Sequence, residues 1–197
     1  IYLHQETKAS VTGLTLSTEQ QKYAQNRAKK LNIEDQVQFL LRDYREDSGP
    51  YDRIVSVGMF EHVGIKHYGE FFEKLKSLLK KDGVALIHTI ARWDGPSVTN
   101  PWLRKYIFPG GLLPSLATLN SAASHNGFRL DNTEAIGDHY ATTLRHWKLR
   151  MKKKHNDILE LGYSDKTFRR FEYYFSYCEG AFLAEHIQNY QLTYKQI

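Results

Sequence analysis

Polar and charged residues follow directly after four of the apolar runs in this sequence, and their types suit them to chemistry. In an open α/β sheet, ligands bind outside the carboxyl ends of the strands. One such residue can cap a strand without any function, but four successive clusters at the same edge favour a binding or catalytic site. The four segments are Thr15-Leu16-Ser17-Thr18-Glu19-Gln20, Arg42-Asp43-Tyr44-Arg45, Gly58-Met59-Phe60-Glu61-His62 and His88-Thr89-Ile90.

The strands that would position these clusters are short apolar runs that alternate with helical patterns. This alternation predicts an α/β domain with a parallel sheet covered by helices. The third strand is expected to be buried on both faces after its first turn. The predicted strands are Val11 to Leu16, Val37 to Leu41, Asp52 to Val57, Val84 to His88, Phe128 to Ile136 and Gln191 to Lys195.

Helical patterns fill the segments between these strands. Ser17 is a predicted N-cap, with Gln20 as its capping-box partner. Apolar residues recur at helical spacing from Tyr68 to Leu79, and Lys80-Lys81-Asp82-Gly83 would end that helix. The pattern loosens over residues 91–126, which contain several prolines, so we predict a substrate lid or insertion there. Two long helices are expected at Tyr140 to Leu161 and Asp165 to His186.

The first residues are unusual for an α/β domain. The segment from Ile1 to Ala9 is typical of the end of a helix that runs into the first predicted strand. Such a domain normally begins with a strand and a glycine-rich turn, and no glycine-rich ligand loop occurs in the sequence. We therefore predict that Ile1 is not the natural N-terminus, that an earlier segment supplies this strand and turn, and that these residues alone are inactive.

Composition and charge limit the class of protein. The 197 residues are 41% apolar and 25% charged, as in a single globular domain. One cysteine, Cys178, allows no internal disulfide, which fits a reducing compartment. No apolar run is long enough to span a membrane. The net charge of +5 includes a basic run from Lys148 to Lys154. This run suits phosphates of a lipid or a nucleic acid, or an ordinary solvated helix face, but no nucleic-acid-binding motif is present.

Several segments, in order along nearly the whole chain, resemble the cyclopropane-fatty-acid synthase family. The block around Phe60-Glu61-His62 and the block around His88-Thr89-Ile90 are together highly specific. The matching segments are Val11 to Ser17 with Gln20, Asp52 to Gly64, Leu86 to Ile90, Lys105 to Gly110, Leu113 to Ser115, His139 to Leu144 and Tyr177 to Phe182.

The resemblance implies a Rossmann-like class I methyltransferase fold, with residues 1–197 forming a single domain and 91–126 its lid or insertion. It implies transfer of a methylene unit from S-adenosylmethionine to the cis double bond of a phospholipid acyl chain. Such an enzyme is expected at the inner membrane, bound peripherally from the cytoplasm, and a homodimer is compatible with it. The family's glycine-rich loop and its more N-terminal lipid-facing segment, with a further active-site cysteine, have no counterpart here, and Cys178 does not match that cysteine.

The resemblance also places the cofactor. Asp43 would accept a hydrogen bond from the adenine amino group and Tyr44 would wall the ring, although Asp43 also reads as a turn residue. Thr15, Leu16 and Gln20 would lie by the ribose and the amino-acid moiety, although Gln20 also reads as a helix cap. Val57 and Gly58 would line the cofactor along the third strand.

The catalytic assignment follows from the reaction. An alkene that attacks a sulfonium methyl leaves a carbocation, which must lose a proton to close the ring. In this family a bound bicarbonate is the base that removes this proton. The positions that hold the bicarbonate match Glu61, His88, Tyr140 and the backbone of Ile90. Tyrosine and histidine can donate hydrogen bonds to an anion, and a carboxylate can accept the anion's own proton. No metal ligand set is expected. A single histidine at a strand end, taken by itself, also reads as a core residue.

Other readings stay open at this point. Mycolic-acid cyclopropane synthases and enzymes that leave a methyl branch are close alternatives. Plant-type small-molecule N-methyltransferases share the Phe-Glu-His block but differ around His88-Thr89-Ile90. A non-enzymatic binding module and a degenerate relative without a cofactor loop are the remaining alternatives.

Overall fold

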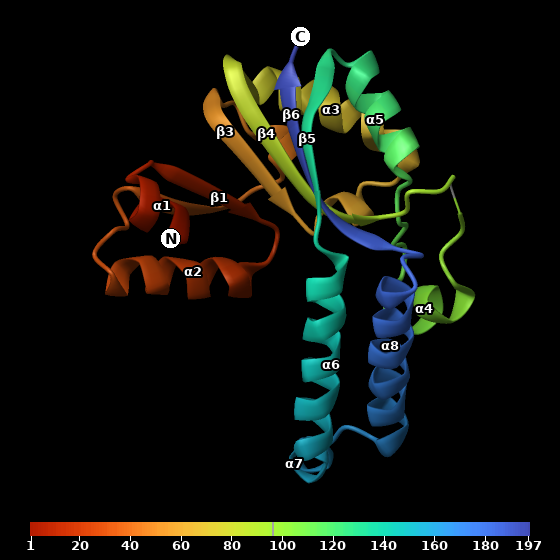
Figure 1. Cartoon of the computed structure of the whole chain (residues 1–197). Coiled ribbons are helices and arrows are strands. Elements are labelled where there is room, and N and C mark those ends of the chain that lie inside the picture. Colours follow the sequence, from red (N-terminus) through yellow and green to blue (C-terminus); the bar gives the residue numbers. More distant parts are fainter. Residues whose placement is uncertain (96) are drawn as a thin grey trace. The chain divides into compact units, whose positions relative to one another are not determined.

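The computed structural model describes residues 1–95 and 97–197, and these form two compact units, Ile1–Gly49 and Pro50–Ile197. Each unit is described by itself. The first unit holds helix α1 (Tyr2–Thr7), strand β1 (Val11–Thr15), helix α2 (Thr18–Lys30), strand β2 (Val37–Leu41) and the short 3₁₀ helix η1 (Tyr44–Glu46) (Figure 1). Strands β1 and β2 pair in parallel, with α2 as the crossover between them. The two strands predicted in this part of the sequence are confirmed.

The start of α2 shows how the first unit sets its local geometry. The Ser17 hydroxyl accepts a hydrogen bond from the Gln20 N–H at 3.2 Å, which confirms Ser17 as the N-cap. The Gln20 side chain does not complete a capping box. Its Oε1 instead accepts a hydrogen bond from the Thr15 hydroxyl at 2.9 Å. That part of the prediction is wrong, because the Ser17 N–H donates to the Thr15 hydroxyl instead of to Gln20.

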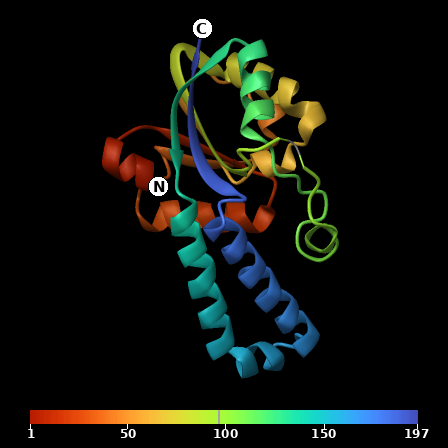
Figure 2. The same cartoon turned by 45° about the vertical axis from the view of Figure 1, so that its right-hand side comes forward.

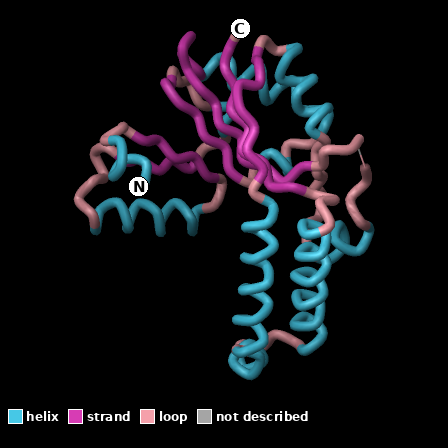
Figure 3. The backbone as a smooth tube through the Cα atoms, in the orientation of Figure 1, coloured by secondary structure: helices cyan, strands magenta, loops and turns pink. Residues whose placement is uncertain are grey.

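The second unit is built on a four-stranded sheet with the order β3-β4-β6-β5 (Figure 1), and Figure 3 shows its strands in magenta. Strands β3 and β4 are parallel, while β6 runs antiparallel to both β4 and β5. The expectation of a parallel sheet therefore holds for β3 and β4 and is wrong at β6. The helical hairpin between β5 and β6 returns the chain to the end of the sheet that it left, so the last strand must run in the opposite direction. The strands are β3 (Tyr51–Val57), β4 (Leu79–Ala91), β5 (Phe128–Ala135) and β6 (Gln188–Gln196).

Helices α3 (Tyr68–Leu78) and α5 (Leu116–His125) contact each other and form the main core with the sheet. The rings of Phe72 and Tyr194 meet at 5.6 Å between their centroids, and Leu119 of α5 is fully buried. Helix α3 ends at Leu78, and the segment predicted to end it begins β4 instead. The short helices η2 (Phe60–His62), η3 (Ile65–His67) and α4 (Pro101–Tyr106) complete this part of the unit.

The segment 91–126 contains two helices, α4 and α5, with Pro96 outside the described residues. Because α5 packs on α3 and β5, the second half of this segment belongs to the core of the unit. The lid or insertion predicted for 91–126 stays a prediction.

Helices α6 (Gly137–Lys153), α7 (His155–Glu160) and α8 (Asp165–Leu183) form a hairpin in which α6 and α8 lie side by side (Figures 1 and 2). The prediction of one helix from Tyr140 to Leu161 is wrong at Lys154. There the backbone N–H bonds to the Met151 carbonyl at 3.1 Å, three residues back, which tightens the last turn and ends α6. None of the described helices is long and apolar enough to cross a bilayer.

Strand β3 differs from its prediction in burial. Val55 and Val57 are 47% and 63% exposed, so the strand is not buried on both faces. Within the four-stranded sheet β3 is an edge strand that pairs only with β4. A strand in the middle of a sheet is covered by neighbours and helices, and an edge strand lacks part of that cover.

Candidate active site

Glu61 caps the sheet at the point where β3 ends before β4 does. The last residue pair of the two strands is Val57 with His88, and the Gly58 N–H still donates to the His88 carbonyl at 2.9 Å. Beyond that point β4 continues to Ala91 without β3 beside it. The N–H of Ile90 therefore has no strand partner on that side, and it donates to Glu61 Oε1 at 2.7 Å. The carboxylate takes the place of a strand carbonyl.

Gly58 allows the chain to leave the sheet at this point. Its φ of +61° lies in the left-handed region that favours glycine, and an added Cβ would meet no atom within 4 Å. The requirement for glycine is therefore set by the backbone turn and not by lack of space. The turn carries Phe60 into the core and leaves Glu61 next to Ile90.

The second carboxylate oxygen of Glu61 is buried and has no hydrogen-bond partner, and the same is true of the Tyr68 hydroxyl. Tyr68 is 2% exposed. Burial, and then the negative charge of Glu61, raise the pKa of Tyr68 to about 12. The phenol is therefore protonated at neutral pH and available as a hydrogen-bond donor. The sequence did not single out Tyr68, because its place at the start of an apolar helical stripe indicates only core packing.

Tyr140 approaches the same carboxylate from the first turn of α6. Burial raises the pKa of its hydroxyl, and the neighbouring Cys178 and Glu61 raise it further. Its ring packs edge-on against Phe182 at 5.2 Å between centroids. The structure therefore brings Glu61, the Ile90 backbone and Tyr140 into one neighbourhood.

His88 lies one pleat before Ile90 on β4. The buried residues of β4 alternate with half-buried ones, and His88 and Ile90 are both half-buried. In a strand, residues two apart point to the same face, so these two side chains share one face of the sheet. His88 thus lies two residues from the Ile90 N–H that Glu61 binds, and its role at the site stays a prediction.

Cys178 does not add a nucleophile to this neighbourhood. It is 9% exposed, and burial raises the pKa of its thiol to about 11. A thiol with such a pKa carries almost no thiolate at neutral pH. Among the described residues, no cluster of histidine, cysteine and carboxylate side chains is suited to hold a metal ion.

The predicted cofactor residues of the first unit form two local groups. Thr15 accepts the Ser17 N–H at 3.1 Å and donates to Gln20, so Thr15 and Gln20 are held together at the end of β1. Leu16 between them is 73% exposed. An exposed leucine beside two fixed polar side chains suits a nucleoside surface.

Asp43, in contrast, is engaged locally. Its Oδ1 accepts the Arg45 N–H at 2.9 Å, and its Oδ2 accepts from the Arg45 guanidinium at 2.6 Å. These hydrogen bonds lower the pKa of the Asp43 carboxyl. The aspartate thus caps η1, which begins at Tyr44. The structure therefore agrees with the interpretation of Asp43 as a turn residue, and its role in adenine binding stays a prediction.

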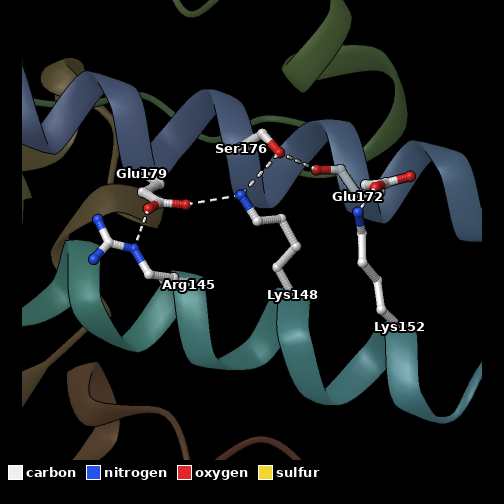
Figure 4. Close-up of polar contacts among 6 residues, drawn as sticks. All are labelled: Arg145, Lys148, Lys152, Glu172, Ser176 and Glu179. Carbon is white, nitrogen blue, oxygen red and sulfur yellow. Dashed lines mark hydrogen bonds and ion pairs between the residues drawn. The ribbon is translucent and has the colours of Figure 1, made fainter.

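The basic run from Lys148 to Lys154 is largely paired within the hairpin. Lys148 donates to Glu179 at 2.9 Å, Lys152 pairs with Glu172, and Lys154 pairs with Asp157 at 2.7 Å. Figure 4 shows the first two of these pairs reaching from α6 to α8. Glu179 also accepts from Arg145 at 2.6 Å. Part of this run therefore joins two helices, which neither the ligand reading nor the solvated-face reading anticipated.

Comparison with known proteins identifies the family of this chain. The family model of mycolic acid cyclopropane synthetase matches residues 2–192. The cyclopropane-fatty-acyl-phospholipid synthase of Escherichia coli (strain K12) is 40% identical over 195 residues, which cover 99% of this chain and 50% of that protein. A tuberculostearic acid methyltransferase of Mycobacterium tuberculosis is 35% identical over 190 residues, covering 94% of this chain and 44% of that protein. The chain thus spans about half the length of these curated relatives.

Solved structures agree with the sequence matches. A mycolic acid cyclopropane synthase complexed with SAH and CTAB superposes with a TM-score of 0.89 at 30% identity, over 98% of this chain and 72% of the other. A coclaurine N-methyltransferase has a TM-score of 0.77 over 98% of this chain and 63% of the other, but its 22% identity shows a shared fold alone. The Rossmann-like methyltransferase fold is therefore confirmed.

Proposed function

The chain belongs to the mycolic acid cyclopropane synthetase family, and on that premise we propose that its protein converts cis double bonds of phospholipid acyl chains into cyclopropane rings. The methylene unit would come from S-adenosylmethionine. The observation that carries the proposal is the half-buried Glu61, whose Oε1 accepts the Ile90 N–H, whose buried Oε2 has no partner, and whose charge helps to raise the pKa of Tyr140. The 40% identity to a synthase named for phospholipids, over 99% of this chain, favours that substrate over a mycolic acid.

The residues around Glu61 suit an anionic base. S-adenosylmethionine would supply the methyl carbon, and bicarbonate would supply the base that removes the proton as the ring closes. The unpartnered Glu61 Oε2 fits such an anion, since it can accept the proton that a bicarbonate carries. Tyr140 is a protonated phenol that can donate to an anion. We assign His88 the role of a second hydrogen-bond donor to the anion, because its side chain and that of Ile90 point to the same face of the sheet. The Ile90 backbone holds Glu61 in place.

We assign cofactor binding to the two groups of the first unit and to the end of β3. Thr15 and Gln20, fixed to each other, would contact the ribose and the amino-acid moiety beside Leu16. Asp43 and Tyr44 would hold the adenine, because Asp43 Oδ2 accepts one hydrogen bond from Arg45 and has a second lone pair for the adenine amino group. Val57, which is 63% exposed, and Gly58 would line the remaining length of the cofactor.

The test is a product analysis with the full-length gene product. Vesicles of unsaturated phospholipid and S-adenosylmethionine should yield acyl chains that gain one methylene unit and lose the double bond. Mass spectrometry after release of the fatty acids separates this ring from a methyl-branched chain, which would favour the related methyltransferases. Turnover on soluble amines with none on lipid would contradict the proposal.

We further propose that the protein works at the cytoplasmic surface of the inner membrane, with the free end of the α6–α8 hairpin as one contact. Residues 148–172 carry eight Lys and Arg against four Asp and Glu, a net charge of +4 in a chain of +5. Leu161 and Tyr163, at the turn between α7 and α8, are 76% and 59% exposed. Basic and apolar groups together are typical of surfaces that bind anionic lipid.

Vesicle flotation tests this contact. The full-length gene product should float with vesicles that contain an anionic phospholipid, and less so at high salt. L161S should weaken flotation. V98S is the control, because Val98 is a similarly exposed apolar side chain (82% exposed) that is far from the hairpin in sequence. V98S should leave flotation unchanged. Equal flotation of both variants would contradict the assignment of the hairpin end.

A further inference from the structure

Four side-chain oxygens among the described residues are buried without a hydrogen-bond partner, and two of them are the Glu61 Oε2 and the Tyr68 hydroxyl. Buried polar atoms in folded proteins nearly always have a partner, which is often an ordered water. The Glu61 oxygen is an acceptor and the phenol is a donor. One buried region therefore contains an unpaired acceptor and an unpaired donor, and one bridging partner would satisfy both.

Tyr68 cannot satisfy its hydroxyl elsewhere. It is the first residue of α3 and 2% exposed, so the hydroxyl does not reach solvent. Its ring lies on the ring of Phe60, with 4.5 Å between the centroids, and Phe60 is the residue directly before Glu61. The aromatic contact therefore fixes the phenol beside the backbone that carries the carboxylate.

The electrostatics agree with this placement. The charge of Glu61 acts on the Tyr68 hydroxyl strongly enough to raise its pKa beyond what burial alone gives. No hydrogen bond joins the two groups directly. A water molecule has the two functions that such a link requires, because it can accept the phenol proton and donate one of its own to Glu61 Oε2.

We propose that one ordered water joins the Tyr68 hydroxyl to Glu61 Oε2, and that Tyr68 is a positioning residue for this carboxylate. The Ile90 N–H fixes only Oε1. A carboxylate held at one oxygen can rotate about its last bond, whereas one held at both cannot. Oε2 has a second lone pair, so the bridge leaves room for the anion. The catalytic consequence rests on the proposed function, but the water bridge does not.

The test compares two tyrosine variants of the full-length gene product. Y68F should remove the water and lower kcat about tenfold or more, with the KM for S-adenosylmethionine unchanged. Y194F is the matched control. Tyr194 is also buried, but its hydroxyl donates to Asn120 at 2.5 Å, so its loss should lower stability and leave kcat unchanged. Thermal unfolding verifies that both variants are folded.

High-resolution crystal structures of wild type and Y68F provide the direct readout. Density for a water within hydrogen-bond distance of both oxygens in wild type, absent in Y68F, supports the bridge. No such water in wild type, or equal kcat values for Y68F and Y194F, would overturn it. A water in place together with no turnover on any lipid counts against the proposed function and not against the bridge.

Discussion

At the scale of single residues, Glu61 has both a structural role and a proposed chemical role. One oxygen satisfies the Ile90 N–H that β3 leaves unpaired, and the other has no partner among the described residues. A neutral glutamine can keep the first contact, because its amide oxygen also accepts. It cannot carry the charge or accept a proton in the same way. This allows the two roles to be separated by one substitution.

We therefore expect E61Q, H88A and Y140F to lower turnover of the full-length gene product by at least about tenfold, with little effect on S-adenosylmethionine affinity. All three lie at the proposed base, and none belongs to the predicted cofactor groups. Single-turnover kinetics and calorimetry measure the two quantities separately. A variant that keeps normal turnover in bicarbonate-depleted buffer would show that its role is misassigned.

Cys178 should be inert in the folded chain. Burial raises its thiol pKa to about 11, and the residue is 9% exposed. Because the thiolate is the reactive form, a thiol reagent at mildly alkaline pH should label it slowly. Labelling should become fast after denaturation. Equal rates before and after denaturation would mean that α8 opens readily.

At the scale of elements, the α6–α8 hairpin is held by Glu179. Burial opposes ionisation of this carboxyl, but hydrogen bonds from Arg145 and Lys148 outweigh it and keep its pKa below the ordinary value of 4.5 (Figure 4). A carboxyl with a depressed pKa in the folded state stabilises the fold above its unfolded pKa. That contribution is lost as pH falls through the folded pKa. The hairpin should therefore weaken in acid.

E179Q should lower the free energy of unfolding by about 1–2 kcal/mol at neutral pH, a value that allows for solvent at the half-exposed Arg145. The deficit relative to wild type should shrink as pH falls below about 4.5, because the unfolded carboxyl takes up a proton first, and it should disappear once pH has passed the lower folded pKa. Urea unfolding at several pH values measures this. E172Q is the control, since the Lys152–Glu172 pair is more exposed and should matter less. A deficit that does not change with pH would contradict the assignment.

At the scale of the whole molecule, residues 1–197 alone should bind S-adenosylmethionine weakly and show no methyltransferase activity. The sequence contains no glycine-rich turn for the methionine part of the cofactor, and Asp43 is engaged by Arg45. Calorimetry should give at least about tenfold weaker binding than the full-length gene product, since these residues match only about half the length of their curated relatives. Micromolar binding by a homogeneous 23.0 kDa species would contradict this expectation.

The sequence by itself determined the local elements and singled out the candidate site segments. Ser17 as N-cap, the positions of β1 to β6 and the helical stripe from Tyr68 follow from period and cap chemistry, which act over a few residues. The clusters at Glu61 and His88 were recognisable because polar residues at strand ends are conspicuous against apolar runs.

Tertiary contacts decided the rest. The antiparallel β6, the exposed Val57 and the pairing of Lys148 with Glu179 depend on partners far away in the sequence. Tyr68 shows the reason most clearly. Its spacing marks it as core, and only the fold reveals that its hydroxyl and Glu61 Oε2 are both left without partners. A hydrophobic period records which residues are buried, whereas the partner of each buried polar atom is set when distant segments meet.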